Sequence, residues 1–378
     1  MTDYAELALL PEGLHDDLPP FAGHEARSIE QLVAQFESHG YERVKPPLIE
    51  FEESLLSGPG AGVARHMFRL MDPISQRMMG LRADMTTQVA RIAATRLAEA
   101  PRPLRLCYSG QVLRVRGSQL RPERQYAQAG VELIGAEGVA GDAELVLLAA
   151  ESLQALGVRG LSVDLTVPTL VPLLTQALGL DGEAAESARQ ALDGRDGAAI
   201  DALPPDVRQP LAKLMRAAGP AKDALKTIAG LDLPASARSL CDHLGALVEF
   251  LDGQNGGLTL TVDPGESRGF EYQTGVSFSL FADGIRGELG RGGRYSLEGG
   301  ESAIGFTLYM DSLMRAIPEA QAPRRLYIPF GMEAAKARKL RVEGWITVQG
   351  LDQVTDPEAE ARTLACDHIL RGDKAAKL

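Results

Sequence analysis

The sequence is poor in cysteine and has no paired cysteine motif. Its 378 residues contain three, Cys107, Cys241 and Cys366, an odd number spread far apart. They form no CxxC pair and no disulfide framework, which is typical of proteins of the reducing cytoplasm. The histidines are isolated and form no HExxH motif, so neither a metal site nor another cofactor is expected.

Long apolar runs and a basic leader are also missing. The first twenty residues, MTDYAELALLPEGLHDDLPP, are acidic, so no signal peptide is expected. No stretch approaches the ~18 unbroken apolar residues of a membrane-spanning helix. We therefore expect a cytoplasmic protein without a membrane partner.

An excess of positive charge is absent as well. The chain has 39 Lys and Arg against 51 Asp and Glu, a net charge of −12. This argues against a general nucleic-acid binder, because phosphate backbones are held by clustered Lys and Arg, although a local basic groove stays open. The 45% apolar and 24% charged content is that of an ordinary globular protein, long enough for two domains.

The most informative stretch is residues 105–135, which predicts two strands around an arginine-rich excursion. RLCYSGQVLRV is apolar and β-prone, GSQLRPER is rich in turn residues and charge, and QYAQAGVELIG alternates. The alternation places Gln128, Gly130 and Glu132 on one face. On pattern alone, a hairpin with one solvated face is favoured, and a polar pocket floor is the alternative.

The segments before this hairpin predict a helix, an extended strand and a second hairpin. Residues 21–39 have the apolar spacing of an amphipathic helix, and residues 41–51 are extended and contain Pro46 and Pro47. Residues 66–82 predict a hairpin, and a helix follows over 83–100. Asp84 stands where a helix N-cap would stand, so capping is its simplest interpretation.

The segments after it predict further strands and a long helical stretch. Helix is expected over 141–157 and through most of 168–250, which contains no catalytic pattern. The remaining expected elements are strands at 161–167, 258–263, 275–282 and 303–310, a glycine-rich loop at 287–296, and a small α/β tail from residue 323 in which 356–370 forms a helix.

Two short motifs have open interpretations. GELGRGGRYS (287–296) could hold a phosphate, but it lacks GxxxxGK[ST] and has strands on both sides, so Gly292 and Gly293 more simply admit a ligand or a neighbouring strand. In RGFEYQTG (268–275), Arg268 could bind a carboxylate through two hydrogen bonds. A surface ion pair between Arg268 and Glu271 is the alternative.

Taken together, these motifs resemble the class II aminoacyl-tRNA synthetases, specifically the histidyl-tRNA synthetase family. GYERVKPPLIEF, VLRVRGSQLRPERQYAQAGVELIG and AIGFTLYMDSLMRAI resemble the three class II motifs in order, and RGFEYQTG resembles the histidine-specific arginine loop. The resemblance implies an α+β fold with a mainly antiparallel sheet flanked by helices. It also implies a core over 1–320, with a helical insertion at about 168–250, and a small C-terminal α/β domain over 321–378.

The resemblance implies a histidine site. Asp84 matches the acidic residue that pairs with the α-ammonium group, and Gln128 and Glu132 match the residues that bind the ammonium and the imidazole N–H. Tyr272 matches a tyrosine lining the imidazole, and Arg268 matches the arginine that reaches the carboxylate. One departure is that Gln273 stands where the family often has a second tyrosine.

The nucleotide half departs further from the family. Arg114 matches the arginine that holds the ATP α-phosphate, but Arg116 stands where an acidic residue is expected and Pro122 where another arginine is expected. Ser312, beside Asp311, replaces the arginine of the third motif. Each lost charge-assisted hydrogen bond is worth ~1.5–3 kcal/mol, so we expect a degenerate nucleotide site and no catalytic residues.

A synthetase core with this combination of features resembles the regulatory subunits of ATP phosphoribosyltransferase. The resemblance implies a chain without activity of its own that self-dimerises through the 21–51 region. It would join the short-form catalytic subunit in a hetero-oligomer, a hetero-octamer, activate the first step of histidine biosynthesis, and bind free histidine for feedback inhibition. An active histidyl-tRNA synthetase is the alternative, and an RNA-binding module is a third hypothesis that the acidic charge disfavours.

Overall fold

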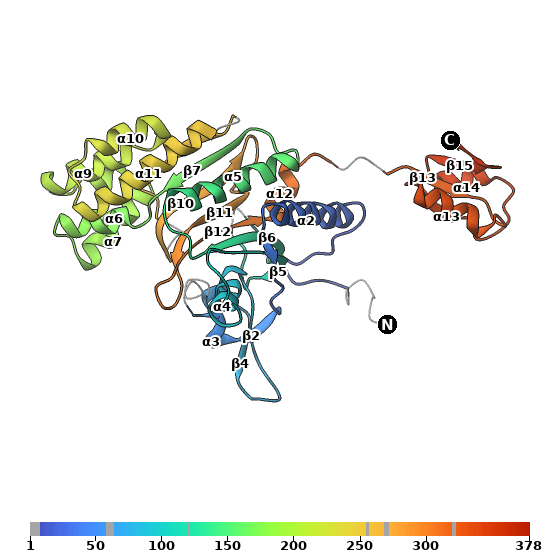
Figure 1. Cartoon of the computed structure of the whole chain (residues 1–378), viewed down its shortest axis with the longest axis horizontal. Coiled ribbons are helices and arrows are strands. Elements are labelled where there is room, and N and C mark those ends of the chain that lie inside the picture. Colours follow the sequence, from blue (N-terminus) through green and yellow to red (C-terminus); the bar gives the residue numbers. More distant parts are fainter. Residues whose placement is uncertain (1–7, 58–63, 119–120, 255–256, 268–271, 320–322) are drawn as a thin grey trace. The chain divides into compact units, whose positions relative to one another are not determined.

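The chain folds into two compact units, Met1–Pro318 and Glu319–Leu378 (Figure 1). The structure, a computed structural model, describes residues 8–57, 64–118, 121–254, 257–267, 272–319 and 323–378. Each unit is built around a sheet of its own.

A nine-stranded sheet forms the centre of the first unit. Its strand order is β1-β5-β6-β12-β11-β10-β7-β9-β8, and all pairs are antiparallel except β1 with β5 and β7 with β9. Together with its flanking helices, this confirms the expected α+β class. The strands are β1 (Glu42–Arg43), β5 (Leu104–Leu113), β6 (Gln125–Ile134), β7 (Leu161–Thr166), β8 (Gly219–Pro220), β9 (Thr259–Val262), β10 (Gln273–Ala282), β11 (Gly290–Ser296) and β12 (Ser302–Tyr309).

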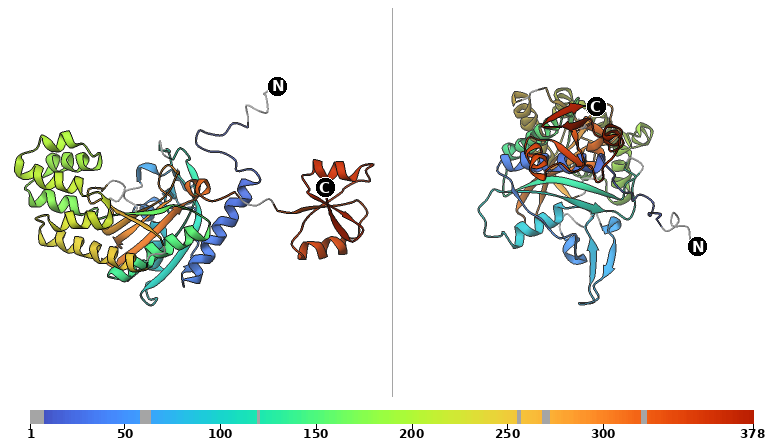
Figure 2. Two further views of the ribbon diagram at one scale, coloured as in Figure 1. Left: turned by 90° about the horizontal axis from the view of Figure 1, so that it is seen from above. Right: turned by 90° about the vertical axis from the view of Figure 1, so that its right-hand side faces the viewer.

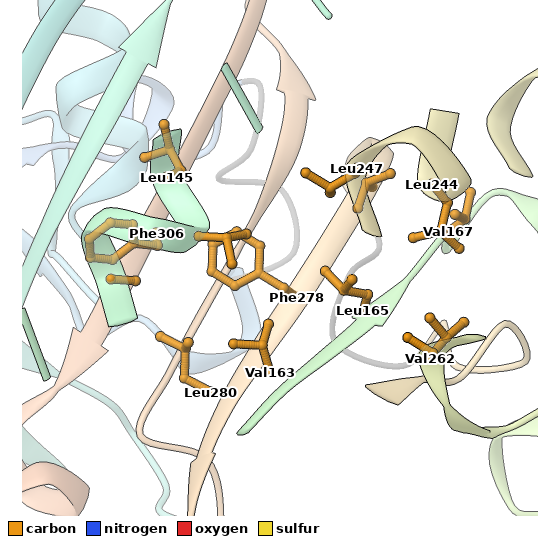
Figure 3. Close-up of a cluster of buried hydrophobic side chains, with 14 of the residues drawn as sticks. Leu145, Val163, Leu165, Val167, Leu244, Leu247, Val262, Phe278, Leu280 and Phe306 are labelled. Atoms are coloured by element: carbon orange, nitrogen blue, oxygen red, sulfur yellow. The ribbon is translucent and has the colours of Figure 1, made fainter. Parts of the chain in front are cut away.

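One face of this sheet carries the main hydrophobic core. Helices α2 (Phe21–Ser38) and α5 (Val139–Ala155) lie against it, next to each other in Figures 1 and 2. Phe306 of β12 and Phe278 of β10 point into this core with Leu145 of α5 (Figure 3). Because side chains alternate along a strand, the neighbours of these residues face the opposite side of the sheet.

The opposite face carries a second, smaller core and the polar residues of interest. Helix α4 (Thr86–Thr95) packs here, with Met85 and Val89 buried against Leu106 and Tyr108 of β5. Below it in Figure 1 lies a three-stranded sheet of order β2-β4-β3, with helix α3 (Glu52–Leu55) beside it. Its strands are β2 (Ile49–Phe51), β3 (Arg69–Met71) and β4 (Met78–Leu81), so residues 66–82 do form the expected hairpin.

The region between β7 and β9 is almost wholly helical. Apolar residues recur at helical spacing, and in α10 Ala221, Ala224 and Ile228 form the buried stripe. These helices join the main core through α11, whose Leu247 lies near Leu165 in Figure 3. They are α6 (Leu170–Ala177), α7 (Gly182–Asp193), α8 (Gly197–Asp201), α9 (Pro205–Arg216), α10 (Ala221–Ala229) and α11 (Ala235–Gln254).

The glycine-rich loop predicted over 287–296 is wrong, because Gly290–Ser296 is strand β11 inside the sheet. The glycines are required by close packing rather than by a turn. A Cβ on Gly292 would lie 2.3 Å from Cζ of Phe278, the residue opposite it on β10. The sheet therefore uses glycine where a bulky neighbour crosses the strand.

The C-terminal unit is a four-stranded sheet of order β14-β13-β15-β16. The helix predicted over 356–370 is wrong in its second half: α14 ends at Thr363, Ala365 takes a φ of 52°, and the buried Ile369 and Leu370 belong to a strand. Its elements are β13 (Arg325–Ile328), α13 (Ala334–Val342), β14 (Ile346–Gln349), α14 (Pro357–Thr363), β15 (His368–Arg371) and β16 (Lys374–Lys377).

Candidate functional site

Two glycines create room for polar side chains on the second face of the large sheet. The strand register aligns Glu132 of β6, Gly305 of β12 and Gly293 of β11 in one row. A Cβ on Gly305 would lie 1.9 Å from Oε2 of Glu132, and one on Gly293 would lie 2.9 Å from Cδ of Gln273. The carboxyl group of Glu132 therefore lies over Gly305 of β12, and the amide of Gln273 lies over Gly293 of β11.

Glu132 is buried in a network of hydroxyl groups. Its side chain accepts hydrogen bonds from Tyr295 at 2.8 Å and from Tyr108 at 3.4 Å, and Tyr108 also lies 2.7 Å from the Thr307 hydroxyl. Burial raises the pKa of Glu132 to about 8, the nearby charge of Asp84 adds to the rise, and the hydroxyl groups offset only part of it. Glu132 is thus largely protonated at pH 7 when nothing else is bound.

The expected solvated face of the 105–135 hairpin is wrong. Gln128 is 0% and Glu132 is 1% exposed, because α4 and its preceding turn cover this face of β6. The alternative, a polar floor under other elements, is the arrangement present. Period-two alternation distinguishes the two faces of a strand but does not say what packs on either of them.

Asp84 and Gln128 form a second polar group beside Glu132. Gln128 Nε2 donates to Asp84 Oδ2 at 2.9 Å, while Gln128 Oε1 accepts from the Met85 backbone N–H at 3.2 Å. Asp84 Oδ1 accepts from the Thr86 N–H at 2.9 Å. One oxygen of Asp84 therefore binds the backbone at the start of α4, although the N-cap residue is Met85 and not Asp84 as expected, and the other oxygen faces Gln128.

Tyr272 and Gln273 lie at the start of β10, on the opposite side of the row. The ring of Tyr272 makes an edge contact with Tyr295 at 5.9 Å between centroids and is 37% exposed, which places it at the rim. Gln273 is 6% exposed, and its buried Oε1 accepts no hydrogen bond from the described residues. This oxygen is available to a ligand N–H. Arg268 lies outside the described residues.

The residues of the expected degenerate nucleotide site lie at the other end of β6. The guanidinium of Arg114 lies 5.6 Å from the ring centroid of Tyr126, and Arg116 is exposed to solvent. Ser312 is buried in α12 (Met310–Ala316) and accepts a hydrogen bond from Arg315 at 3.2 Å. Arg116 is therefore solvated, and the Ser312 hydroxyl is hydrogen-bonded within its own helix.

Arg121 is the important residue of this region that the sequence comparison passed over. Its Nε lies 2.9 Å from Oδ2 of Asp311, and its guanidinium lies 3.8 Å from the ring centroid of Tyr309. The class II motif pointed to the adjacent residue, Pro122, as the position of the missing arginine. A shift of one residue in the loop is enough to miss Arg121. The charge of Arg121 is thus already paired with an acidic side chain of the same chain.

The described residues contain neither a membrane-spanning helix nor a cluster of metal ligands. No described helix combines the length and the apolar character needed to cross a membrane. Within the same residues, no three His, Cys, Asp or Glu side chains converge as metal ligands would.

The chain is similar to known proteins over nearly its whole length. The family model described as histidyl-tRNA synthetase matches residues 13–313. An ATP phosphoribosyltransferase regulatory subunit from Paramagnetospirillum magneticum is 54% identical over 373 residues, which cover 99% of this chain and 98% of that protein. The chain belongs to the family of ATP phosphoribosyltransferase regulatory subunits.

Other members and solved structures extend this family picture. The regulatory subunit of Rhodospirillum rubrum is 51% identical, with 97% of this chain and 96% of that protein covered. A solved ATP phosphoribosyltransferase regulatory subunit/histidyl-tRNA synthetase from Bacillus halodurans C has a TM-score of 0.82 at 24% identity, with 94% of this chain and 96% of that chain covered. That likeness supports the fold, as does a histidyl-tRNA synthetase from Nostoc with a TM-score of 0.79 at 17% identity over 96% and 90% of the two chains.

Proposed function

We propose that this regulatory subunit has no catalytic activity of its own, activates the short-form catalytic subunit of ATP phosphoribosyltransferase in the cytoplasm, and binds free histidine for feedback inhibition. The observation that carries the proposal is the pair of acidic side chains on one polar floor, the buried Glu132 and the half-buried Asp84. Burial and the charge of Asp84 disfavour the ionised form of Glu132, and a cationic ligand would stabilise that form.

Histidine fits this floor group by group. Its α-ammonium is a donor for Asp84 and Gln128, whose hydrogen bond to each other would open to admit it. Its imidazole N–H is a donor for Glu132. In the imidazolium, the second ring N–H is a donor for the amide oxygen of Gln273, which accepts no hydrogen bond from the described residues, or for the hydroxyl of Tyr272 at the rim. The ligand carboxylate would be bound by Arg268.

The nucleotide half supports the absence of catalysis. Arg121 is ion-paired with Asp311, so binding a phosphate there would require breaking that pair and would bring the phosphate close to a carboxylate. Ser312 has no positive charge to offer. Histidine can therefore be bound without being activated by ATP.

We propose the remaining partners from the resemblance of the sequence motifs. The chain would self-dimerise through the 21–51 region and join catalytic subunits in a hetero-octamer, without nucleic acid or membrane. Binding of histidine and of the substrates must then be reciprocal: if histidine disfavours the active assembly, substrates that favour it weaken histidine binding by the same factor.

Reconstitution with the short-form catalytic subunit tests the proposal. The wild-type chain should raise phosphoribosyltransferase activity, and histidine should inhibit the complex. Glu132→Gln should still activate but lose sensitivity to histidine, while Glu183→Gln, an exposed carboxylate on α7, serves as the matched control and should behave as wild type. Absence of activation by the wild-type chain would contradict the proposal.

The alternative, an active histidyl-tRNA synthetase, is tested by histidine-dependent ATP–pyrophosphate exchange. We expect none above background, because Ser312 and the Arg121–Asp311 pair leave the nucleotide half without its phosphate contacts. Exchange at a rate typical of a synthetase would establish the alternative.

A further inference from the structure

A cavity of about 190 Å³ lies where the nucleotide half of the fold would be. The segment before α2, the first turn of α2, the β5–β6 hairpin and α12 all contribute to its walls. Nothing in the proposed histidine site uses it. Its lining includes Asp17, Glu25, Glu123, Tyr126, Asp311 and Met314.

The cavity is rich in negative charge. It is lined by four carboxylates, Asp17, Glu25, Glu123 and Asp311, against the cationic side chain of Arg315 and the imidazole of His15. His15 Nε2 lies 3.3 Å from Asp17 Oδ1, and Arg121 approaches Asp311 from the hairpin. Burial raises the pKa of Glu25, and the charges of Asp17 and Asp311 raise it further, so the carboxylates are close and incompletely compensated.

Several polar atoms of this cavity lack hydrogen-bond partners among the described residues. Tyr126 is only 4% exposed, and its hydroxyl is unpartnered. Glu123 Oε2 is buried and accepts no hydrogen bond from the described residues, whereas Asp311 is partnered by Arg121 and by the Ser312 backbone N–H. Buried polar atoms are nearly always hydrogen-bonded, so this group calls for a donor from outside.

We infer that the cavity binds an alkyl ammonium or alkyl guanidinium group. Such a group supplies the missing N–H donors and positive charge, and its stem can lie along Phe21, Met314 and the ring of Tyr126. A phosphate is disfavoured by the charge, and the described residues form no metal-ligand cluster. The group belongs either to a free small cation or to a Lys or Arg side chain of a docked protein.

Calorimetric titration of the full chain with butylguanidinium, butylammonium and neutral butanol, at matched ionic strength, tests the cavity. The cations should bind saturably and butanol should not. Glu25→Gln and Asp311→Asn should weaken cation binding about tenfold or more, and Tyr126→Phe by less, whereas Asp201→Asn on α8 should have no effect. Glu25 makes no hydrogen bond with the described residues, so its variant avoids the risk that Asp311→Asn misfolds by freeing Arg121.

Absence of saturable binding, equal binding of butanol, or unchanged affinity in both Glu25→Gln and Asp311→Asn would overturn the inference. A second titration distinguishes the sources. If a docked protein supplies the cation, saturating butylguanidinium weakens association with the short-form catalytic subunit, and Glu25→Gln weakens it too. If association is unchanged in both cases while butylguanidinium binds, the natural ligand is a small cation. Because histidine is absent from both titrations, they stand apart from the test of the histidine site.

Discussion

Glu132 combines near-complete burial with a carboxyl group, and this combination shapes the chemistry of the site. The residue is 1% exposed and is surrounded by the hydroxyl groups of Tyr295 and Tyr108. Hydroxyl donors suit a carboxylate, but two of them do not replace the hydration that burial removes. The protein without ligand therefore holds this group largely as the neutral acid at pH 7.

A pH dependence of stability follows from this state. Because the pKa of Glu132 is raised from about 4.5 in the unfolded chain to about 8 in the folded one, its contribution is fully present below pH 4.5 and is lost as the pH rises through 8. Across this pH window, we expect the unfolding free energy of the wild-type chain to fall by on the order of a few kcal/mol more than that of Glu132→Gln, as measured by chemical unfolding. Parallel curves for the two proteins would contradict the raised pKa.

At the residue scale, the sequence indicated which residues lie together better than it indicated what surrounds them. The resemblance grouped Asp84, Gln128 and Glu132, and the first two are hydrogen-bonded to each other in the fold. It gave no indication of Arg121, because an ion pair with Asp311 joins a loop to a helix far away in the chain. Pairings of this kind depend on the folded geometry of a loop, which residue spacing does not encode.

At the scale of elements, glycines in β11 and β12 decide what the sheet can hold. The glycine-rich run was predicted as a loop, since glycine is usually unfavourable inside strands. In the fold, Gly305 leaves the space for Glu132, and Gly292 leaves the space for Phe278 on the other face. Local propensity thus gave a wrong prediction for β11, where packing against the neighbouring strands determines which residue fits. The long helices and the 105–135 hairpin were predictable from their periodicity.

Gly305→Ala tests this role of the strand. The added Cβ would lie 1.9 Å from Glu132 Oε2 and 2.6 Å from the Val131 carbonyl oxygen, so the strand or the acid must move. We expect a loss of ~1–3 kcal/mol in unfolding free energy, together with loss of histidine binding. Gly245→Ala in α11 is the control, because nothing lies within 4 Å of its Cβ position; it should be neutral or stabilising by ~0.5–1 kcal/mol. A Gly305→Ala protein with wild-type stability and binding would contradict the account.

At the scale of the whole molecule, the first unit exposes apolar side chains where the family resemblance predicts a self-dimer. Leu48 is 40% and Ile49 is 37% exposed, both within the 21–51 region, and Met78 of the paired strand β4 is 41% exposed. Leu48 and Ile49 are adjacent in the chain and are candidates for this interface. The sequence alone predicted an edge or interface strand here, but not the side chains that surround it.

Ile49→Glu should therefore shift the chain from dimer to monomer in sedimentation at micromolar concentration, since a buried unpaired charge opposes association. Leu351→Glu, at a residue 79% exposed in the C-terminal unit, is the control and should leave the assembly unchanged. A stable dimer of the Ile49→Glu protein would show that the self-dimer uses another surface.

The measurement that tests the account most directly is calorimetric titration of the full wild-type chain with L-histidine. The account predicts saturable binding of one histidine per chain, and a loss of more than ~2 kcal/mol of binding free energy, about 30-fold in affinity, for Glu132→Gln but none for Glu183→Gln. No saturable binding by the wild-type chain, or equal affinity of wild type and Glu132→Gln, would contradict it.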